Sequence, residues 1–114
     1  MYCLLPVPVI ALFSASNSLE LFYLCKVVSF GKATEELKDE NNHRIGKDNS
    51  YIEVNYFEKK PNSEFTKGSI IYKSLPTTMY VHPAQVMSSK VNVTFVGSNI
   101  HVTRDEYQWL CDSI

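Results

Sequence analysis

Apolar and polar residues alternate in short segments of the chain, and these segments end close to glycine or proline. The clearest case is Val91–Val102, where the alternation is interrupted by the turn sequence Gly97-Ser98-Asn99. Because successive side chains of a strand point to opposite faces, this pattern predicts a β-hairpin. Leu19–Phe30 and Ser50–Glu58 are rich in β-branched and aromatic residues and predict two further strands. The chain is therefore predicted to be mainly β.

The rest of the chain supplies weaker strand signals and one helix signal. Ile70–Tyr72 and Met79–Val81 predict two short strands, separated by Leu75-Pro76, while residues 33–49 are polar and predict a long exposed loop. Thr103 and Glu106 have the spacing of a capping box and precede Tyr107 and Leu110 at helical spacing. We predict a small antiparallel, SH3-like β-barrel of five to six strands with one short C-terminal α-helix.

The predicted core consists of the apolar positions of these strands. They are Leu21 or Phe22, Leu24, Val27, Ile52, Val54, Ile70, Val81, Val93, Phe95 and Ile100.

Length and composition indicate one domain. The chain has 114 residues, 45% of them hydrophobic, and this is enough to form a single core without metal or disulfide crosslinks. We assign that domain to residues 19–114. Residues 1–18 carry no charge and are interpreted either as an apolar lead-in that packs on the domain or as a signal peptide, although the basic n-region is missing. The apolar run is too short to span a bilayer, so no membrane association is predicted.

Charge and cysteine usage exclude several function classes. The formal net charge of -1 excludes a globally basic binder of nucleic acid. Cys3, Cys25 and Cys111 are odd in number and widely spaced, which predicts neither a disulfide framework nor a zinc site and favours an intracellular location. The three histidines have no metal-ligand spacing, and no nucleophile or phosphate-binding motif is present. We predict a non-enzymatic protein without metal or cofactor.

Three segments in order carry a resemblance to a known group of domains. Phe22–Val28, Tyr51–Glu58 and Met79–Val86, the last containing Val81-His82-Pro83, resemble the succession of strands in Tudor, chromo-barrel and bromo-adjacent-homology (BAH) domains. The resemblance covers roughly residues 20–96. It implies a Tudor-like or BAH-like barrel that acts as a protein-interaction module in the nucleus, with a protein or peptide partner such as a histone tail in chromatin.

In the methyl-lysine readers of this group, an aromatic cage holds the quaternary ammonium by cation–π attraction. The candidates that the resemblance implies here are five aromatic residues and one carboxylate: Phe22, Tyr23, Tyr51, Tyr56, Phe57 and Glu53, with Glu58 as the alternative to Glu53. The competing interpretation is that these rings are ordinary strand and core residues, as expected for a small β domain.

Two alternatives to this function remain open from the sequence. Lys59, Lys60, Lys67 and Lys73 lie among aromatic residues, a pattern typical of a single-stranded nucleic-acid-binding, OB-like barrel. The second alternative is a secreted β-domain, which the apolar N-terminus and the glycosylation sequon at Asn92 would suit. The oligomeric state is not predicted.

Overall fold

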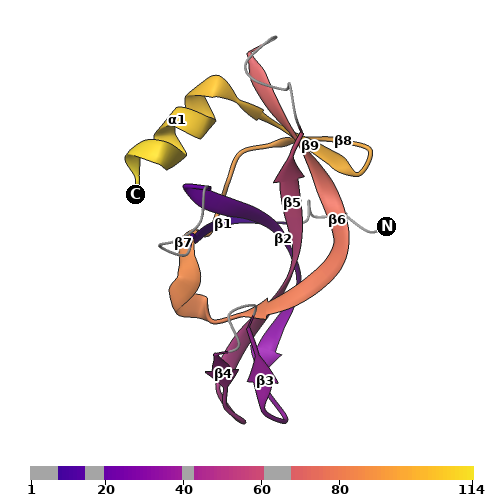
Figure 1. The fold of residues 1–114 in the computed structure, drawn as a ribbon, viewed down its shortest axis with the longest axis vertical. Coiled ribbons are helices and arrows are strands. Elements are labelled where there is room, and N and C mark those ends of the chain that lie inside the picture. The colour runs from indigo at the N-terminus through magenta and orange to yellow at the C-terminus, as the bar shows by residue number, and fades with distance from the viewer. Residues whose placement is uncertain (1–7, 15–19, 40–42, 61–67) are drawn as a thin grey trace, which may run out of the picture.

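The computed structural model describes residues 8–14, 20–39, 43–60 and 68–114, which form a curled antiparallel sheet and one helix (Figure 1). Seven strands make up the sheet, in the order β7-β1-β2-β5-β6-β9-β8. Their bounds are Val9–Phe13 for β1, Phe22–Lys32 for β2, Ser50–Lys59 for β5, Ser69–Val81 for β6, Val86–Ser88 for β7, Thr94–Val96 for β8 and Asn99–Thr103 for β9. Leu37–Lys38 (β3) and Arg44–Ile45 (β4) form a separate small hairpin. The prediction of a mainly β, antiparallel fold is confirmed.

The sheet curls because β6 runs past β5 and leads back toward the opposite edge. After β6, the 3₁₀ turn η1 (Pro83–Gln85) brings the chain into β7, which pairs with β1 rather than with β6. In Figure 1, β1, β2, β5, β6 and β7 surround one interior. Within the described residues no ladder joins β7 to β6 or to β8, so the hydrogen bonding of the sheet does not close into a barrel. The seven strands of the sheet also exceed the five to six predicted.

Two apolar clusters stabilise the two faces of this sheet. The cluster inside the curl contains Ile10, Leu12, Cys25, Val54 and Val81, with Val86 of β7 packed against it. The cluster on the opposite face is larger and contains Val9, Ala11, Phe22, Leu24, Phe57, Ile70, Tyr72, Val91, Ile100, Val102 and Leu110. Because the central strands contribute to both clusters, they are buried on both sides.

The sheet begins at Val9, within the segment that the sequence separated from the domain at residues 19–114. Strand β1 lies between β7 and β2, and Ile10, Ala11 and Leu12 are all buried. A strand covered on both faces reads as a continuous apolar run and lacks the alternation by which the other strands were recognised. The rest of the predicted lead-in, residues 1–7 and 15–18, lies outside the described part of the chain.

The stretch 33–49 is not the fully exposed loop that its composition predicted. Its strands β3 and β4 pair with each other, and two of its residues, Ala33 and Ile45 of β4, are buried. The buried Asp39 carboxylate accepts a hydrogen bond of 2.9 Å from the amide of His43. Local strand pairing and the burial of two apolar side chains therefore order a segment that has no hydrophobic period.

Residues 69–81 form one long strand instead of the two short ones predicted. A bulge interrupts its pairing with β5, since Asn55 pairs with Thr78 but Phe57 pairs with Ser74. The buried Asn55 amide donates to the carbonyls of Leu75 at 2.7 Å and Thr77 at 2.9 Å, and its oxygen accepts from the Ser74 hydroxyl at 2.7 Å. One side chain thus replaces the ladder hydrogen bonds that the bulge removes.

The prediction that Phe95 belongs to the core is wrong. Strand β8 is the edge of the sheet, and Phe95 is 41% exposed there. The alternation of apolar and polar residues predicted the hairpin, but it does not show which elements pack against either face of that hairpin. No group of described residues covers the whole Phe95 ring. Of the alternatives at the start of β2, Phe22 is buried and Leu21 exposed. The other predicted core residues are buried (Leu24, Val54, Ile70, Val81, Ile100) or half-buried (Val27, Ile52, Val93).

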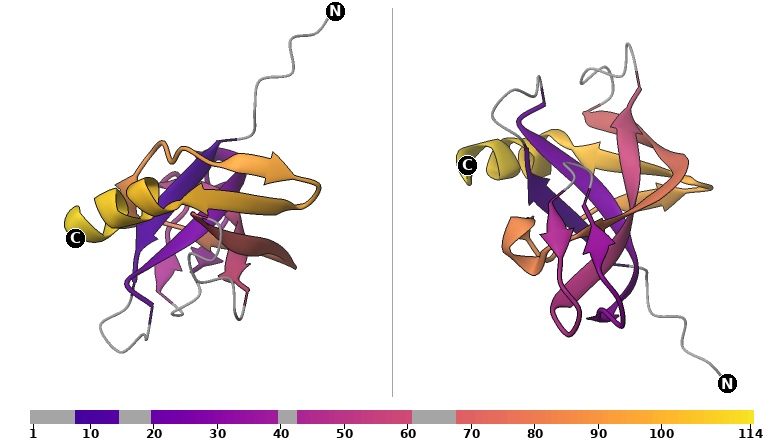
Figure 2. Two further views of the ribbon diagram at one scale, coloured as in Figure 1. Left: turned by 90° about the horizontal axis from the view of Figure 1, so that it is seen from above. Right: turned by 60° about the horizontal axis from the view of Figure 1, so that its bottom comes forward.

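The C-terminal helix α1 (Arg104–Asp112) begins where the sequence predicted. The Thr103 hydroxyl accepts from the amide of Glu106 at 3.2 Å, as in a capping box. The Glu106 carboxylate, however, accepts from the amide of Asn92 at 3.2 Å, so it connects the helix to the segment before β8. Leu110 is fully buried and Trp109 is exposed. Figure 1 shows α1 and the β8–β9 hairpin at the end of the molecule opposite to β3 and β4, and the view from above in Figure 2 shows the helix and the hairpin extending to opposite sides.

Candidate functional site

Strands β2 and β5 separate at one end, and the gap between them forms a groove. Their ladder stops at the pair Cys25–Tyr56. Beyond that pair, Phe22–Leu24 continues along β1, whereas Phe57–Lys59 continues along β6. Side chains that would otherwise lie on opposite faces of one sheet can therefore line a common groove.

This groove, which we call the aromatic groove, has a volume of about 400 Å³. It is lined by Glu20, Phe22, Tyr23, Leu24, Tyr56, Phe57, Glu58, Lys59, Tyr72 and Leu75. Four of the six cage candidates from the sequence, Phe22, Tyr23, Tyr56 and Phe57, are among these residues. The fold therefore brings most of the predicted candidates together.

The aromatic residues of the groove differ in how much of their surface they present. Tyr23 and Tyr56 are half-buried and meet edge to face, with ring centroids 5.8 Å apart and an interplanar angle of 82°. Phe22 and Phe57 are buried, at 5% and 6% exposure, and Phe22 also packs against Tyr107 of α1. The two phenylalanines thus form the floor of the groove, and the tyrosine pair supplies its accessible rings.

Carboxylates dominate the charge at the groove. Glu20 and Glu58 are exposed at its rim, and among the described residues Lys59 is the one lysine that lines it. Burial raises the pKa of Tyr72 far above its ordinary value, with smaller contributions from Tyr107, Glu20 and Cys111. Tyr72 is therefore a neutral phenol throughout the physiological range. The groove therefore combines neutral aromatic surface with two anionic groups and one cationic group.

The remaining two cage candidates lie elsewhere. Tyr51 packs edge to face on Tyr80, with centroids 5.6 Å apart. Glu53 accepts a hydrogen bond of 2.9 Å from the Ser29 hydroxyl. Neither residue lines the aromatic groove. The sequence missed Glu20 and Tyr72, and the one signal for Glu20 was its position as the first charge before an aromatic strand.

The lysines of the nucleic-acid alternative do not line one basic groove in the described part of the chain. Lys59 and Lys60 are half-buried at the end of β5, and Lys73 is exposed on β6, directly opposite Glu58. Lys67 lies outside the described residues. The acidic neighbour of Lys73 reduces the positive field that phosphates would require.

The described residues offer neither a metal site nor a membrane-spanning helix. No cluster of three or more His, Cys, Asp or Glu side chains is placed to hold a metal ion. His82 accepts a hydrogen bond at Nδ1 from the amide of Ala84 and caps η1. Within the described ranges, no helix has the length and apolar character needed to cross a membrane.

Comparison of the chain with protein-family models, with curated proteins and with solved structures found no match in any of the three.

Proposed function

We propose that this protein is a non-enzymatic interaction module that binds a cationic side chain of a partner peptide in the aromatic groove. The observation that carries the proposal is the convergence of Tyr23, Tyr56 and Tyr72 with Glu20 and Glu58 on one groove. A lysine, and above all a methylated lysine, is the ligand that such a groove suits.

Two physical terms favour a cation there. Aromatic faces attract an ammonium group by about 0.5 to 2 kcal/mol for each contact, depending on how far the site is desolvated. Carboxylates at the rim add Coulomb attraction and exclude anionic ligands. Methylation makes the ammonium larger and easier to remove from water, so a methylated lysine suits an aromatic site better than an unmodified one.

The resemblance to Tudor, chromo-barrel and BAH domains supports the same class of ligand. A curled antiparallel sheet is consistent with the SH3-like barrel that the resemblance implies. We accordingly extend the proposal to a modified-lysine tail in a chromatin protein, bound inside the nucleus. A single groove that contacts one side chain and a short piece of peptide gives weak binding, with a dissociation constant of about micromolar or higher.

Calorimetric titration with two peptides tests this function. The peptides carry either one trimethyl-lysine or one unmodified lysine between neutral residues. We expect the wild type to bind the trimethylated form more tightly, and we expect Tyr56→Leu to weaken that binding by about three- to thirtyfold because it removes one cation–π contact. Tyr51→Leu changes a tyrosine of the other edge-to-face pair and is the matched control, for which no change is expected.

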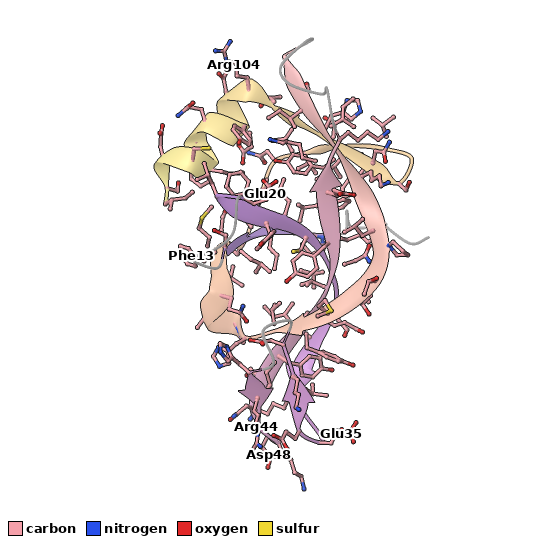
Figure 3. The ribbon with its side chains drawn as sticks, viewed as in Figure 1. Phe13, Glu20, Glu35, Arg44, Asp48 and Arg104 are labelled. Atoms are coloured by element: carbon pink, nitrogen blue, oxygen red, sulfur yellow. The ribbon has the colours of Figure 1, made fainter. Side chains whose placement is uncertain are left out.

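A charge comparison checks the same site without touching packed residues. The double change Glu20→Gln with Glu58→Gln should weaken binding of the trimethylated peptide by about tenfold, since each exposed ion contact is worth up to about 1 kcal/mol. Glu35 and Asp48 lie at the far end of the molecule from Glu20 (Figure 3), so Glu35→Gln with Asp48→Asn is the control. Equal affinity for both peptides would refute the proposal. Tighter binding of oligothymidine with a steep salt dependence would favour the nucleic-acid alternative.

A further inference from the structure

A second recessed surface, distinct from the aromatic groove, consists of two adjoining apolar hollows. The first has a volume of about 510 Å³, and its lining includes Pro8, Ile10, Val27, Phe30, Lys32 and Ile52. The second has a volume of about 430 Å³, and its lining includes Pro8, Val9, Ser89, Lys90, Val93 and Phe95. Ile10 and Val9 face opposite sides of β1, so the two hollows lie on opposite faces of the sheet and meet beside Pro8 and Ser89, which line both. We call the two hollows together the apolar channel.

Phe30 is the most exposed large apolar side chain of this channel, at 79%. The pairing of β2 with β5 shifts between Val27 and Ser29, so Val28 is an extra residue on β2. Beyond this bulge, Phe30 pairs with Ile52, and both residues line the channel beside Val27. The bulge thus places a phenylalanine over an apolar surface where nothing in the described chain covers it. Exposed apolar surface of this kind is typical of interaction sites.

The charge of the channel is opposite to that of the aromatic groove. Among the described residues that line it, the charged side chains are Lys32 and Lys90, and no carboxylate is present. A partner that fills the channel with apolar side chains would therefore gain from carboxylates that reach Lys32 in the first hollow and Lys90 in the second.

We propose that the apolar channel binds an extended segment of a partner protein in which apolar residues are flanked by aspartate or glutamate. Two other occupants fit the charges less well. A second copy joined through a two-fold interface would bring Lys32 and Lys90 of both copies to one contact, which is repulsive. Residues 1–7 of the chain itself contain no carboxylate to pair with these lysines.

Fluorescence anisotropy with the full chain and two labelled peptides tests this inference. The probes are acetyl-Asp-Leu-Ile-Pro-Leu-Asp-amide and the same peptide with lysine in place of both aspartates. We expect the acidic peptide to bind at least tenfold more tightly than the lysine peptide. Phe30→Ala should weaken binding of the acidic peptide by about tenfold, as expected for a large apolar contact in a binding site. Phe13→Ala removes another exposed phenylalanine ring, at 49% exposure, that lines neither hollow, and it should have no effect.

The lysines are tested separately. The double variant Lys32→Gln with Lys90→Gln should weaken binding of the acidic peptide by about fivefold. The control variant Lys38→Gln with Lys73→Gln should leave that binding unchanged. The Glu20→Gln, Glu58→Gln protein should bind this peptide normally, so failure of the aromatic groove and failure of the channel give different results.

Three results would overturn the inference: no binding of the acidic peptide, equal binding of both peptides, or an equal loss of binding in Phe13→Ala and Phe30→Ala. Dimerisation abolished by Phe30→Ala, or peptide binding seen only after removal of residues 1–7, would assign the channel to another occupant and also overturn it.

Discussion

Replacing Leu24 with alanine is expected to lower the free energy of unfolding by about 2 to 5 kcal/mol. Leu24 is 1% exposed and belongs to the larger core cluster, which it shares with Ile100 and Leu110. Strand β2 lies between β1 and β5, so the backbone around Leu24 has little freedom to collapse into the space that the leucine leaves. The loss is comparable to the whole stability of a small domain. Urea denaturation followed by circular dichroism measures it.

Phe95→Ala is the informative comparison for this experiment. An edge strand and 41% exposure predict a change below about 1 kcal/mol, even though more atoms are removed than in Leu24→Ala. If Phe95→Ala destabilises the protein as much as Leu24→Ala, then β8 packs its phenylalanine inward and the arrangement described for the β8–β9 hairpin is incorrect.

Asn55→Leu is expected to lower the free energy of unfolding by about 3 kcal/mol. The substitution removes the amide that donates to the carbonyls of Leu75 and Thr77 and leaves the Ser74 hydroxyl without its acceptor. Each buried polar group left unsatisfied costs about 1 to 3 kcal/mol, partly offset here by the added apolar surface. Because the bulge places Leu75 in the aromatic groove, we also expect weaker binding of the trimethyl-lysine peptide.

Two variants control for this result. Asn92→Leu changes an exposed asparagine and should alter stability by less than about 0.5 kcal/mol. Asn55→Asp preserves the shape, but an ionised carboxylate faces the two carbonyls, so the pKa of the introduced carboxyl is raised in the folded state. The deficit relative to wild type should then shrink as the pH falls through that raised pKa, since the protonated carboxyl donates one hydrogen bond. A deficit that does not change between pH 7 and pH 4 would contradict the role assigned to Asn55.

The parts of the fold that the sequence predicted are those fixed by local chemistry. Alternation and turn residues identified Ser50–Glu58, which β5 matches to within one residue, and the Thr103 cap located the start of α1. Strand β1 was not recognised because burial on both faces removes the alternation. The exposure of Phe95 could not be inferred either. Apolar residues at every second position show that one face of a strand is more apolar than the other, but they do not show which elements cover each face.

The aromatic groove was only partly predictable for a related reason. The resemblance pointed to aromatic residues on two strands, and Tyr23 and Tyr56 do meet, at 5.8 Å between centroids. The groove itself depends on where the β2–β5 ladder ends, at Cys25–Tyr56, and on the bulge that Asn55 stabilises. Both are long-range consequences of pairing with β1 and β6. No local pattern distinguished Tyr51, which packs on Tyr80, from Tyr56.

Mapping the binding of the trimethyl-lysine peptide by amide chemical shifts in nuclear magnetic resonance tests the central claim most directly. The claim is that the separated ends of β2 and β5 form the binding site. We expect the largest shift changes at Phe22–Leu24 and Phe57–Lys59, with smaller changes at Tyr72 and none around Phe30 or in the β3–β4 hairpin. Largest changes around Phe30 and Ile52, or in the β3–β4 hairpin, would show that the peptide binds elsewhere and would contradict the claim.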